Sequence, residues 1–216
     1  MSGTRHIFLR TVLVLMALAV VAAWTSPGFA QNADSNPTSR DAILRDPDIP
    51  ALGNPNGDLT IVEWFDYQCP YCKKSAPVLA KVAKQDGKVR LVHKDWPILG
   101  PVSVYAARMV QAAKFQNKYE AAHQALIGAQ GVLTEERVRD ILAKAGVDVA
   151  KASSDLEANK KSVDDLLARN NTQAEALGFN GTPSFIVGIF RVPGVLEEVG
   201  FKAAIADARK AMAKQK

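Results

Sequence analysis

Strand-like and helix-like patterns alternate along most of this 216-residue chain. Two runs rich in β-branched and aromatic residues, 59–65 and 89–95, predict buried strands. Between them a helical pattern runs from Pro70 to about Gln85, and Gly87 ends it. Pro70 suits an early helical position, where its missing N–H would have no intrahelical partner. A strand, a helix and a strand in this order predict a βαβ unit with two parallel strands.

A long helical stretch follows the second strand. Ala-rich helical periodicity runs from Val102 to about Leu177. Thr134, with two acidic residues directly after it, is typical of a helix start. The periodicity is interrupted at three places, which are Gly128 to Gly131, Gly146 and the neighbourhood of Asn170. We therefore expect an all-helical insertion over about residues 100–178.

Strand signals return after Gly178. Residues 183–187 predict a strand and 189–192 a hairpin partner for it. A last helix, from Phe201 to about Ala213, carries apolar residues along one face. The predicted order is βαβ, the helical insertion, and then ββα. Without the insertion, these elements form a compact four-stranded α/β sandwich, in which we expect Trp64, Trp96 and Phe185 to be core residues.

The first thirty residues have the pattern of a secretory signal peptide. Arg5 and Arg10 form a basic start, fourteen uncharged and mostly apolar residues follow from Thr11 to Trp24, and small residues precede Gln31. We expect cleavage after Ala30. An uncleaved membrane anchor is the alternative, but the apolar run falls short of the roughly 20 residues that span a bilayer.

The mature chain divides at Asp58. Residues 31–57 are rich in Asn, Asp, Ser, Pro and Gly and predict a flexible N-terminal tether that ends in a turn. Residues 58–216 then form one domain. Removal of residues 1–30 leaves 216 − 30 = 186 residues, of a chain that is 48% hydrophobic, which is enough for one domain with a sizeable core.

The charge balance argues against a nucleic-acid site. The formal net charge of +5 becomes 5 − 2 = +3 without residues 1–30, which hold two arginines and no acid. Lysines follow one helical stretch at positions typical of a solvated face, namely Lys73, Lys74, Lys81 and Lys84. We therefore expect no nucleic-acid partner.

Cys69 and Cys72 are the chain's two cysteines, and they form a C-x-x-C motif. A disulfide between them closes a very short loop, so it constrains the unfolded chain little and is a poor structural staple. The spacing suits thiol exchange instead: one thiolate attacks a substrate disulfide, and the second resolves the mixed disulfide. A pair of unreactive buried thiols is the alternative.

A zinc site is not expected at this motif. A structural zinc site needs four nitrogen or sulfur ligands. Besides the two cysteines the chain offers His6, His93 and His123, without the spacing of a zinc module, and His6 lies in the predicted signal peptide. We expect no metal and no cofactor other than a redox-active disulfide between Cys69 and Cys72.

Two separated stretches carry a family resemblance. Residues 63–73, which include the C-x-x-C, and residues 181–187, which include Thr182 and Pro183, resemble the thioredoxin superfamily. With its predicted export and long helical insertion, the chain resembles the DsbA-like thiol:disulfide oxidoreductases of bacterial periplasms. The resemblance covers nearly all of residues 58–216. It implies a thioredoxin fold, a central mixed sheet built from βαβ and ββα halves, with the helical insertion between them.

The resemblance also implies roles for single residues. Pro183 is expected in the cis form beside the disulfide, and with Thr182 it would form the backbone edge on which a substrate peptide lies. Glu63 matches a buried acid beneath the cysteines, and Pro77 matches a proline that kinks the active-site helix. For Thr182 and Pro183 an ordinary turn is the alternative, and for Glu63 a solvated carboxylate at the strand end.

Further roles follow from the placing of the motif. Cys69, at a helix N-terminus, is expected to be the nucleophile, because unpaired N–H groups and the helix dipole stabilise a thiolate there. Cys72, one turn later, is expected to be the buried resolving thiol, with Glu63 moving its proton. Pro70 and Tyr71 would tune the redox potential, unless Tyr71 is only a surface aromatic residue.

Two further points concern alternatives. His93 is either a redox-tuning or a structural residue. The dipeptide between the cysteines also occurs in glutaredoxins, which are short, usually cytosolic domains. The predicted signal peptide and the inserted helices favour the DsbA-like assignment.

The expected function is a periplasmic oxidase that introduces disulfides into unfolded or reduced exported proteins. A membrane redox partner of the DsbB type would reoxidise it, and the chain would act as a monomer. One alternative is a disulfide isomerase or reductase that a DsbD-type membrane partner keeps reduced. The other is a redox-inert chaperone on the same scaffold.

Overall fold

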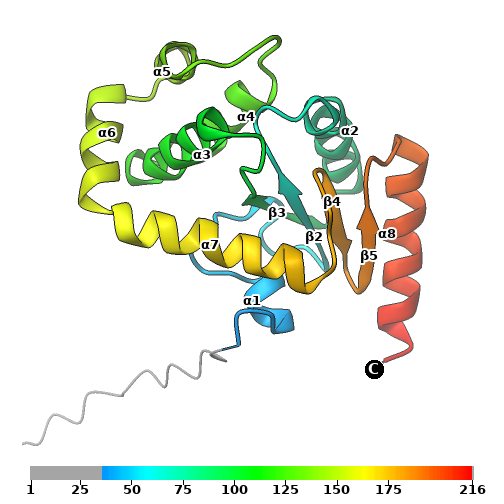
Figure 1. Cartoon of the computed structure of the whole chain (residues 1–216). Helices are drawn as coiled ribbons and strands as arrows, with labels where there is room; N and C mark the ends of the chain where they lie inside the picture. Colours follow the sequence, from blue (N-terminus) through cyan, green and yellow to red (C-terminus); the bar gives the residue numbers. More distant parts are fainter. Residues whose placement is uncertain (1–35, 216) are drawn as a thin grey trace, which may run out of the picture. The chain divides into compact units, whose positions relative to one another are not determined.

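A computed structural model describes residues 36–215 of the chain (Figure 1). The predicted signal peptide over residues 1–30, its cleavage after Ala30 and the first residues of the predicted tether lie outside the described residues. Among the helices formed by residues 36–215, none combines the length and apolar character that a membrane span requires.

Five strands form one mixed sheet. They are β1 (Leu52–Gly53), β2 (Leu59–Phe65), β3 (Val89–Asp95), β4 (Ser184–Val187) and β5 (Phe190–Pro193). The sheet order is β1-β3-β2-β4-β5. Strands β2 and β3 are parallel, and the other neighbours are antiparallel. The predicted βαβ and ββα halves are therefore confirmed, and β1 adds a fifth strand at one edge.

Helices cover both faces of the sheet. On one face α2 (Pro70–Asp86) and α8 (Glu198–Ala213) pack side by side against residues such as Ile61 and Phe185. On the other face α1 (Arg40–Leu44) and α7 (Lys160–Ala176) pack against Trp64 and its neighbours. Every residue of β2 and β3 is buried, as expected for central strands covered on both faces.

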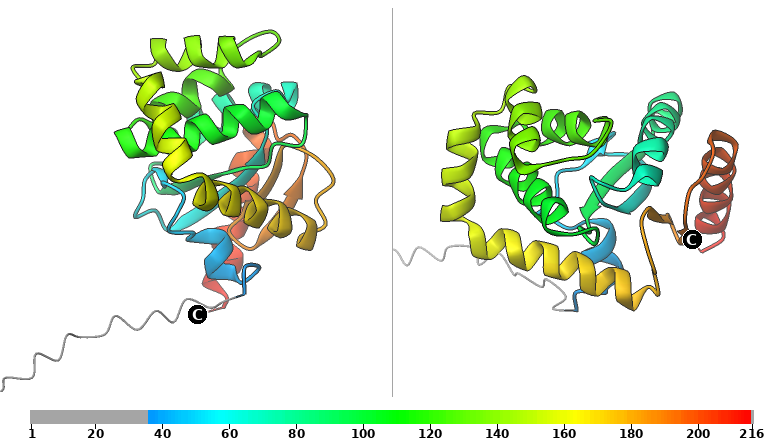
Figure 2. Two further views of the ribbon diagram at one scale, coloured as in Figure 1. Left: turned by 60° about the vertical axis from the view of Figure 1, so that its left-hand side comes forward. Right: turned by 45° about the horizontal axis from the view of Figure 1, so that its top comes forward.

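The predicted helical insertion lies between β3 and β4. It consists of α3 (Pro101–Ala113), the short 3-10 helix η1 (Lys114–Gln116), α4 (Tyr119–Ile127), α5 (Glu135–Lys144), α6 (Val149–Ala158) and α7. Figure 2 shows α3, α4, α5 and α6 gathered on one side of the sheet, whereas α7 leads back toward β4. Their apolar core also contains Cys69 and Cys72, so the insertion packs directly against the C-x-x-C.

The structure corrects the prediction of a tether that reaches Asp58. Residues 36–57 hold α1 and β1, and Ile43, Leu44 and Ile49 are buried with Trp64 in the core. The Asn, Pro and Ser content of this segment favoured the prediction of a tether. The burial of its three apolar side chains nevertheless holds the segment in an ordered position on the sheet.

Two helix boundaries also differ from the prediction. α7 runs unbroken through Asn170, because that side chain donates a hydrogen bond to the carbonyl of Asp95 instead of ending the helix. α8 starts at Glu198 rather than Phe201, one turn before its first buried apolar residue. The start of α5 after Thr134 is confirmed, since the Thr134 side chain accepts a hydrogen bond from the N–H of Arg137.

Candidate active site

Cys69 is the N-cap residue of α2. Its Sγ accepts a hydrogen bond from the N–H of Cys72 at 3.4 Å, and Pro70 occupies the first turn. Both cysteines carry free thiols. Cys69 retains 3% of its accessible surface and Cys72 none, so an attacking sulfur can reach only Cys69. The strand, the cap and the helix thus place the two thiols in unlike surroundings, as the sequence predicts.

Electrostatics separates the two thiols further. A hydrogen bond from the Cys72 side chain lowers the pKa of Cys69 to about 6, against burial, and the Thr182 side chain and backbone N–H groups contribute. Burial raises the pKa of Cys72 well above the ordinary thiol range, and the hydrogen bond to Cys69 and the charge of Glu63 raise it further. At neutral pH Cys69 is therefore mostly a thiolate and Cys72 a thiol.

The Thr182–Pro183 loop lies against Cys69. The peptide bond between these two residues is cis, which confirms the expectation for Pro183. When Cys69 is protonated, its Sγ donates a hydrogen bond to the carbonyl oxygen of Thr182 at 3.2 Å. The two stretches that carry the family resemblance, more than a hundred residues apart in sequence, therefore meet at the reactive sulfur.

Glu63 on β2 and His93 on β3 form a buried pair. They are opposite each other in the parallel register of β2 and β3. Nδ1 of His93 lies 2.9 Å from Oε2 of Glu63, and both side chains are buried. Oε1 of Glu63 bonds no group among residues 36–215. The structure thus excludes a solvated carboxylate at Glu63, and one oxygen of that carboxylate has no partner in the described part of the chain.

The loop before Cys69 is held by a carboxylate that the sequence analysis missed. Oδ1 of Asp66 accepts hydrogen bonds from the N–H of Gln68 and the hydroxyl of Ser103, both at 2.7 Å, and Oδ2 accepts one from the N–H of Leu99 at 2.9 Å. The N–H of Cys69 in turn donates to the carbonyl of Asp66 at 3.1 Å. An Asp at the end of a strand, two residues before an N–H it can bond, is a turn signal that could have identified it.

Two of the predicted tuning residues, Pro70 and Tyr71, are both exposed. They lie in the first turn of α2, and Tyr71 is 63% exposed. Lys73 departs from the predicted solvated face, because its Nζ donates a 2.6 Å hydrogen bond to the carbonyl of Ala129 in the insertion. Pro77 lies inside α2, as the resemblance implies. The redox-tuning roles of Pro70 and Tyr71 stay predictions.

A cavity of about 1060 Å³ lies between α2, α4 and the edge formed by β1 and β3. Its lining includes His93 and His123. Nδ1 of His123 lies 3.1 Å from the hydroxyl of Tyr67, two residues before Cys69. The cavity therefore reaches from the surface to the polar groups behind the thiol site.

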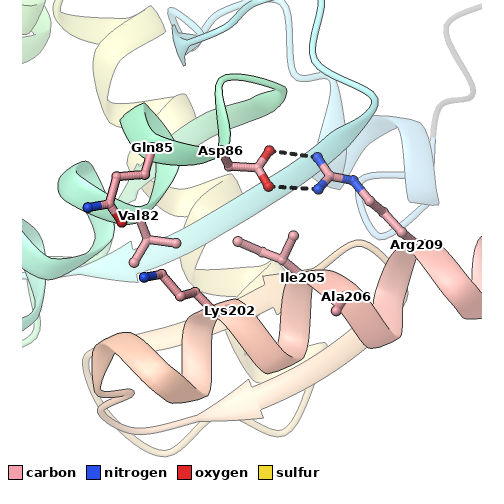
Figure 3. Close-up of a pocket in the computed structure, with 7 residues that line it drawn as sticks. All are labelled: Val82, Gln85, Asp86, Lys202, Ile205, Ala206 and Arg209. Carbon is pink, nitrogen blue, oxygen red and sulfur yellow. Dashed lines mark hydrogen bonds and ion pairs between the residues drawn. The ribbon is translucent and has the colours of Figure 1, made fainter.

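A second, smaller hollow of about 320 Å³ lies between α2 and α8. Figure 3 shows that it is bordered by Asp86 and Arg209, which are joined by two hydrogen bonds, both of 2.7 Å. Its α2 residues belong to the last turns of that helix, whereas Cys72 lies in the first. This hollow is a feature of the α2–α8 contact and not of the thiol site.

Comparisons with known proteins agree with this geometry. A family model described as a DSBA-like thioredoxin domain matches residues 60–206. A thioredoxin-like oxidoreductase from Silicibacter pomeroyi DSS-3 is 44% identical, with a TM-score of 0.76, over 80% of this chain and 98% of that one. The thiol-disulfide exchange protein alpha-DsbA2 from Wolbachia pipientis is 27% identical, with a TM-score of 0.72, over 77% and 90%.

Two further proteins are similar over most of this chain. A periplasmic thioredoxin-like protein from Salmonella enterica serovar Typhimurium is 26% identical, with a TM-score of 0.68, over 78% of this chain and 94% of that one. The Na(+)/H(+) antiporter NhaA 1 of Mycobacterium sp. (strain KMS) is 28% identical over 178 residues, which are 79% of this chain and 28% of that protein. The chain spans about a quarter of the length of the curated relatives it matches.

The fold, the capped C-x-x-C and the cis-proline loop thus agree with the sequence comparison. The match over residues 60–206 covers more than half of the chain. The chain belongs to the DSBA-like thioredoxin domain family and has the thioredoxin-like fold of thiol–disulfide oxidoreductases.

Proposed function

We propose that this chain is a periplasmic thiol:disulfide oxidoreductase that introduces disulfides into exported proteins through Cys69 and Cys72. The observation that carries the proposal is the asymmetry of the two thiols. The pKa of Cys69 is lowered to about 6 at an accessible position, while burial raises the pKa of Cys72. Only a thiolate attacks and leaves readily in disulfide exchange, so the two sulfurs have distinct tasks.

The proposed reaction begins with a disulfide between Cys69 and Cys72. A substrate thiolate attacks Sγ of Cys69, the enzyme S–S bond breaks, and Cys72 leaves and gains a proton. A second substrate thiolate attacks the substrate sulfur of the mixed disulfide and expels the Cys69 thiolate. Two electrons have then passed from the substrate thiols to the enzyme. A membrane partner of the DsbB type would accept these electrons and restore the disulfide.

Glu63 is proposed to move the proton of Cys72. Its charge already acts on that thiol, and its Oε1 bonds no other described group. A positioned carboxyl group can give a proton to a departing thiolate and take it back when the thiol must attack. Cys72 is buried away from bulk water, so a proton carrier inside the protein is needed.

The direction of exchange follows from the stability of the Cys69 thiolate. A stabilised thiolate is a good leaving group, so the enzyme disulfide is easily reduced and oxidises its substrates. This favours the oxidase over an isomerase or reductase that a DsbD-type partner keeps reduced. The backbone beside Thr182 and Pro183 is proposed to receive the substrate peptide, because it is already bonded to the reactive sulfur.

Location and partners belong to the same proposal. The predicted signal peptide supports export, and the similar Salmonella protein is described as periplasmic. Reduced or unfolded exported proteins would be the substrates. We propose no cofactor besides the Cys69–Cys72 disulfide, and we expect the protein to act as a monomer.

A glutathione titration of the mature protein tests the proposal. We expect a reduction potential nearer the roughly −120 mV of DsbA than the roughly −270 mV of thioredoxin. A value near that of thioredoxin would contradict the oxidase and favour the reductase. A redox-inert chaperone predicts that Cys69→Ser leaves all activity on a reduced, unfolded substrate unchanged, whereas we expect that variant to lose its oxidase activity.

A further inference from the structure

His93 joins the thiol site to the cavity between α2 and α4. Its Nδ1 is bonded to Glu63, and its ring lines the cavity. Its Nε2 makes no hydrogen bond with any described residue, and this atom is not fully buried. Nε2 therefore retains accessible surface, and the cavity is where the ring can meet water.

The Glu63–His93 pair has two ends with different neighbours. At one end the charge of Glu63 acts on Cys72, and Oε1 is free to take a proton. At the other end Nε2 of His93 faces the cavity. A buried pair with a net charge is costly, whereas a carboxylate with an imidazolium, or a carboxyl with a neutral imidazole, has zero net charge.

We propose that His93 is the proton outlet of the thiol site, releasing a proton from Nε2 into the cavity whenever Glu63 accepts one from Cys72. The inference rests on the proposed exchange chemistry. The S–H bond of Cys72 breaks and an O–H bond forms at Glu63, while the Nε2–H bond of His93 breaks and its proton joins cavity water. No atom is oxidised or reduced in this step, and the Glu63–His93 pair keeps zero net charge. The reverse sequence supplies the proton when Cys72 leaves.

Other titratable groups line the cavity or belong to the elements packed around it. They are Asp95 on the same strand as His93, Tyr67 after β2, Cys72, Lys73 and Lys84 on α2, and Tyr119, Glu120 and His123 on α4. Burial raises the pKa of Tyr67 and Tyr119 and lowers that of His123, so these three are neutral near pH 7. Burial also raises the pKa of Asp95 to about 7. Glu63 is the acid that His93 contacts directly, at 2.9 Å.

A structural role and a proton outlet make different demands on residue 93. A structural residue needs only to donate a hydrogen bond to Glu63, which a glutamine amide can also do. An outlet must gain and lose a proton near neutral pH, and among the side chains an imidazole suits that range. His93→Gln therefore separates the two roles. His123→Gln is the matched control, because His123 lines the same cavity but does not bond Glu63.

The resolving step can be measured directly. Reduced full-length mature protein is mixed with saturating glutathione disulfide, and the glutathione adduct of Cys69 is followed by acid quench and mass spectrometry. Its decay reports the attack of Cys72. We expect His93→Gln to slow the decay at least about tenfold, since positioned proton transfer contributes about 10²- to 10⁴-fold. His123→Gln should decay at nearly the wild-type rate.

Two further readouts keep the inference testable if a variant folds poorly. Between about pH 5 and 8, where imidazoles titrate, the wild-type decay rate should change with one more ionisation than that of His93→Gln. Free imidazole should accelerate the decay in His93→Ala and not in His123→Ala. Three results would each contradict the role of His93 as a proton outlet. The wild-type decay rate could show no imidazole ionisation, the wild type and His93→Gln could decay at equal rates, or the slow decay of His93→Ala could fail to respond to free imidazole. If no adduct forms in the wild type, the proposed function itself fails.

Discussion

Nζ of Lys94 lies 3.1 Å from Oδ2 of Asp46, and both side chains are buried. Arg169 on α7 adds a second cation to the same carboxylate at 3.0 Å. Asp46 lies between α1 and β1, whereas Lys94 lies on β3, next to His93. These ion pairs therefore fix the N-terminal segment on the sheet face opposite the thiol site.

Asp46→Ala should lower the free energy of unfolding by about 3–5 kcal/mol, because it leaves the Lys94 cation buried without its partner. Urea denaturation of the oxidised protein measures the change. Asp48→Ala is the control: Asp48 contacts the same arginine at 2.7 Å but is largely exposed, so its removal should cost no more than about 1 kcal/mol. Equal losses in the two variants would contradict a special role for the buried pair.

The pKa of Cys69 near 6 predicts how the reduced protein responds to pH. Iodoacetamide alkylation should rise through about pH 6 and level off above it. Because the folded pKa lies below the ordinary value of 9.0, the thiolate stabilises the reduced fold as pH rises from about 6 to 9, and that stability is lost as pH falls through 6. The oxidised protein has no thiolate and should lack this dependence.

Cys72→Ala tests what lowers the pKa of Cys69. The hydrogen bond from Cys72 is the largest factor lowering the pKa of Cys69. Its removal should shift the alkylation midpoint upward, toward the ordinary thiol value. An unchanged midpoint would assign the stabilisation to the helix N-terminus and Thr182 instead.

Glu63→Gln should separate stability from activity. The substitution removes a buried carboxylate with one unpartnered oxygen, so the oxidised protein should be as stable as the wild type or more so. The attack of Cys72 should slow by about 10²-fold or more, since no carboxylate accepts its proton. Thermal unfolding and decay of the Cys69–glutathione adduct measure the two effects. Glu120→Gln, at the cavity wall, should change neither.

Arg209 is expected to fasten α8 to α2. It bonds both oxygens of Asp86 (Figure 3). It also bonds Asp58, and its pairing with Asp86 lowers the pKa of that carboxyl group. Arg209→Leu should cost about 1 kcal/mol at neutral pH, with less effect at high salt. Since the folded pKa of Asp86 is depressed below 3.8, this contribution is present above that value and fades as the pH falls below it. Lys161→Ala, which removes an exposed pair with Asp165, should change stability little.

The sequence was sufficient for the elements whose signals are local. The limits of β2 and β3 coincide with runs of β-branched residues, and α2 begins at the Cys-Pro step as predicted. It was insufficient where distant partners decide the outcome. Ile43 and Ile49 become ordered through burial against Trp64, and Asn170 stays helical because its side chain finds a strand carbonyl.

The same distinction holds at the site. The two thiols and their order along a helix start follow from residue spacing. The Glu63–His93 contact depends on the register of two parallel strands, which residue patterns alone leave open. The contact between Tyr67 and His123 joins the active-site loop to the insertion across 56 positions, and no local pattern marks it.

The bonds of Asp66 bear on how this protein could be shortened. The N–H of Leu99 and the hydroxyl of Ser103, at the entry to the insertion, supply two of the three hydrogen bonds that hold this carboxylate. A minimal domain made by joining residue 96 to residue 179 would keep both cysteines and every strand. It would also release the loop that aims Cys69. Removal of the helices would therefore lower the reactivity of Cys69, although both cysteines would remain in the chain.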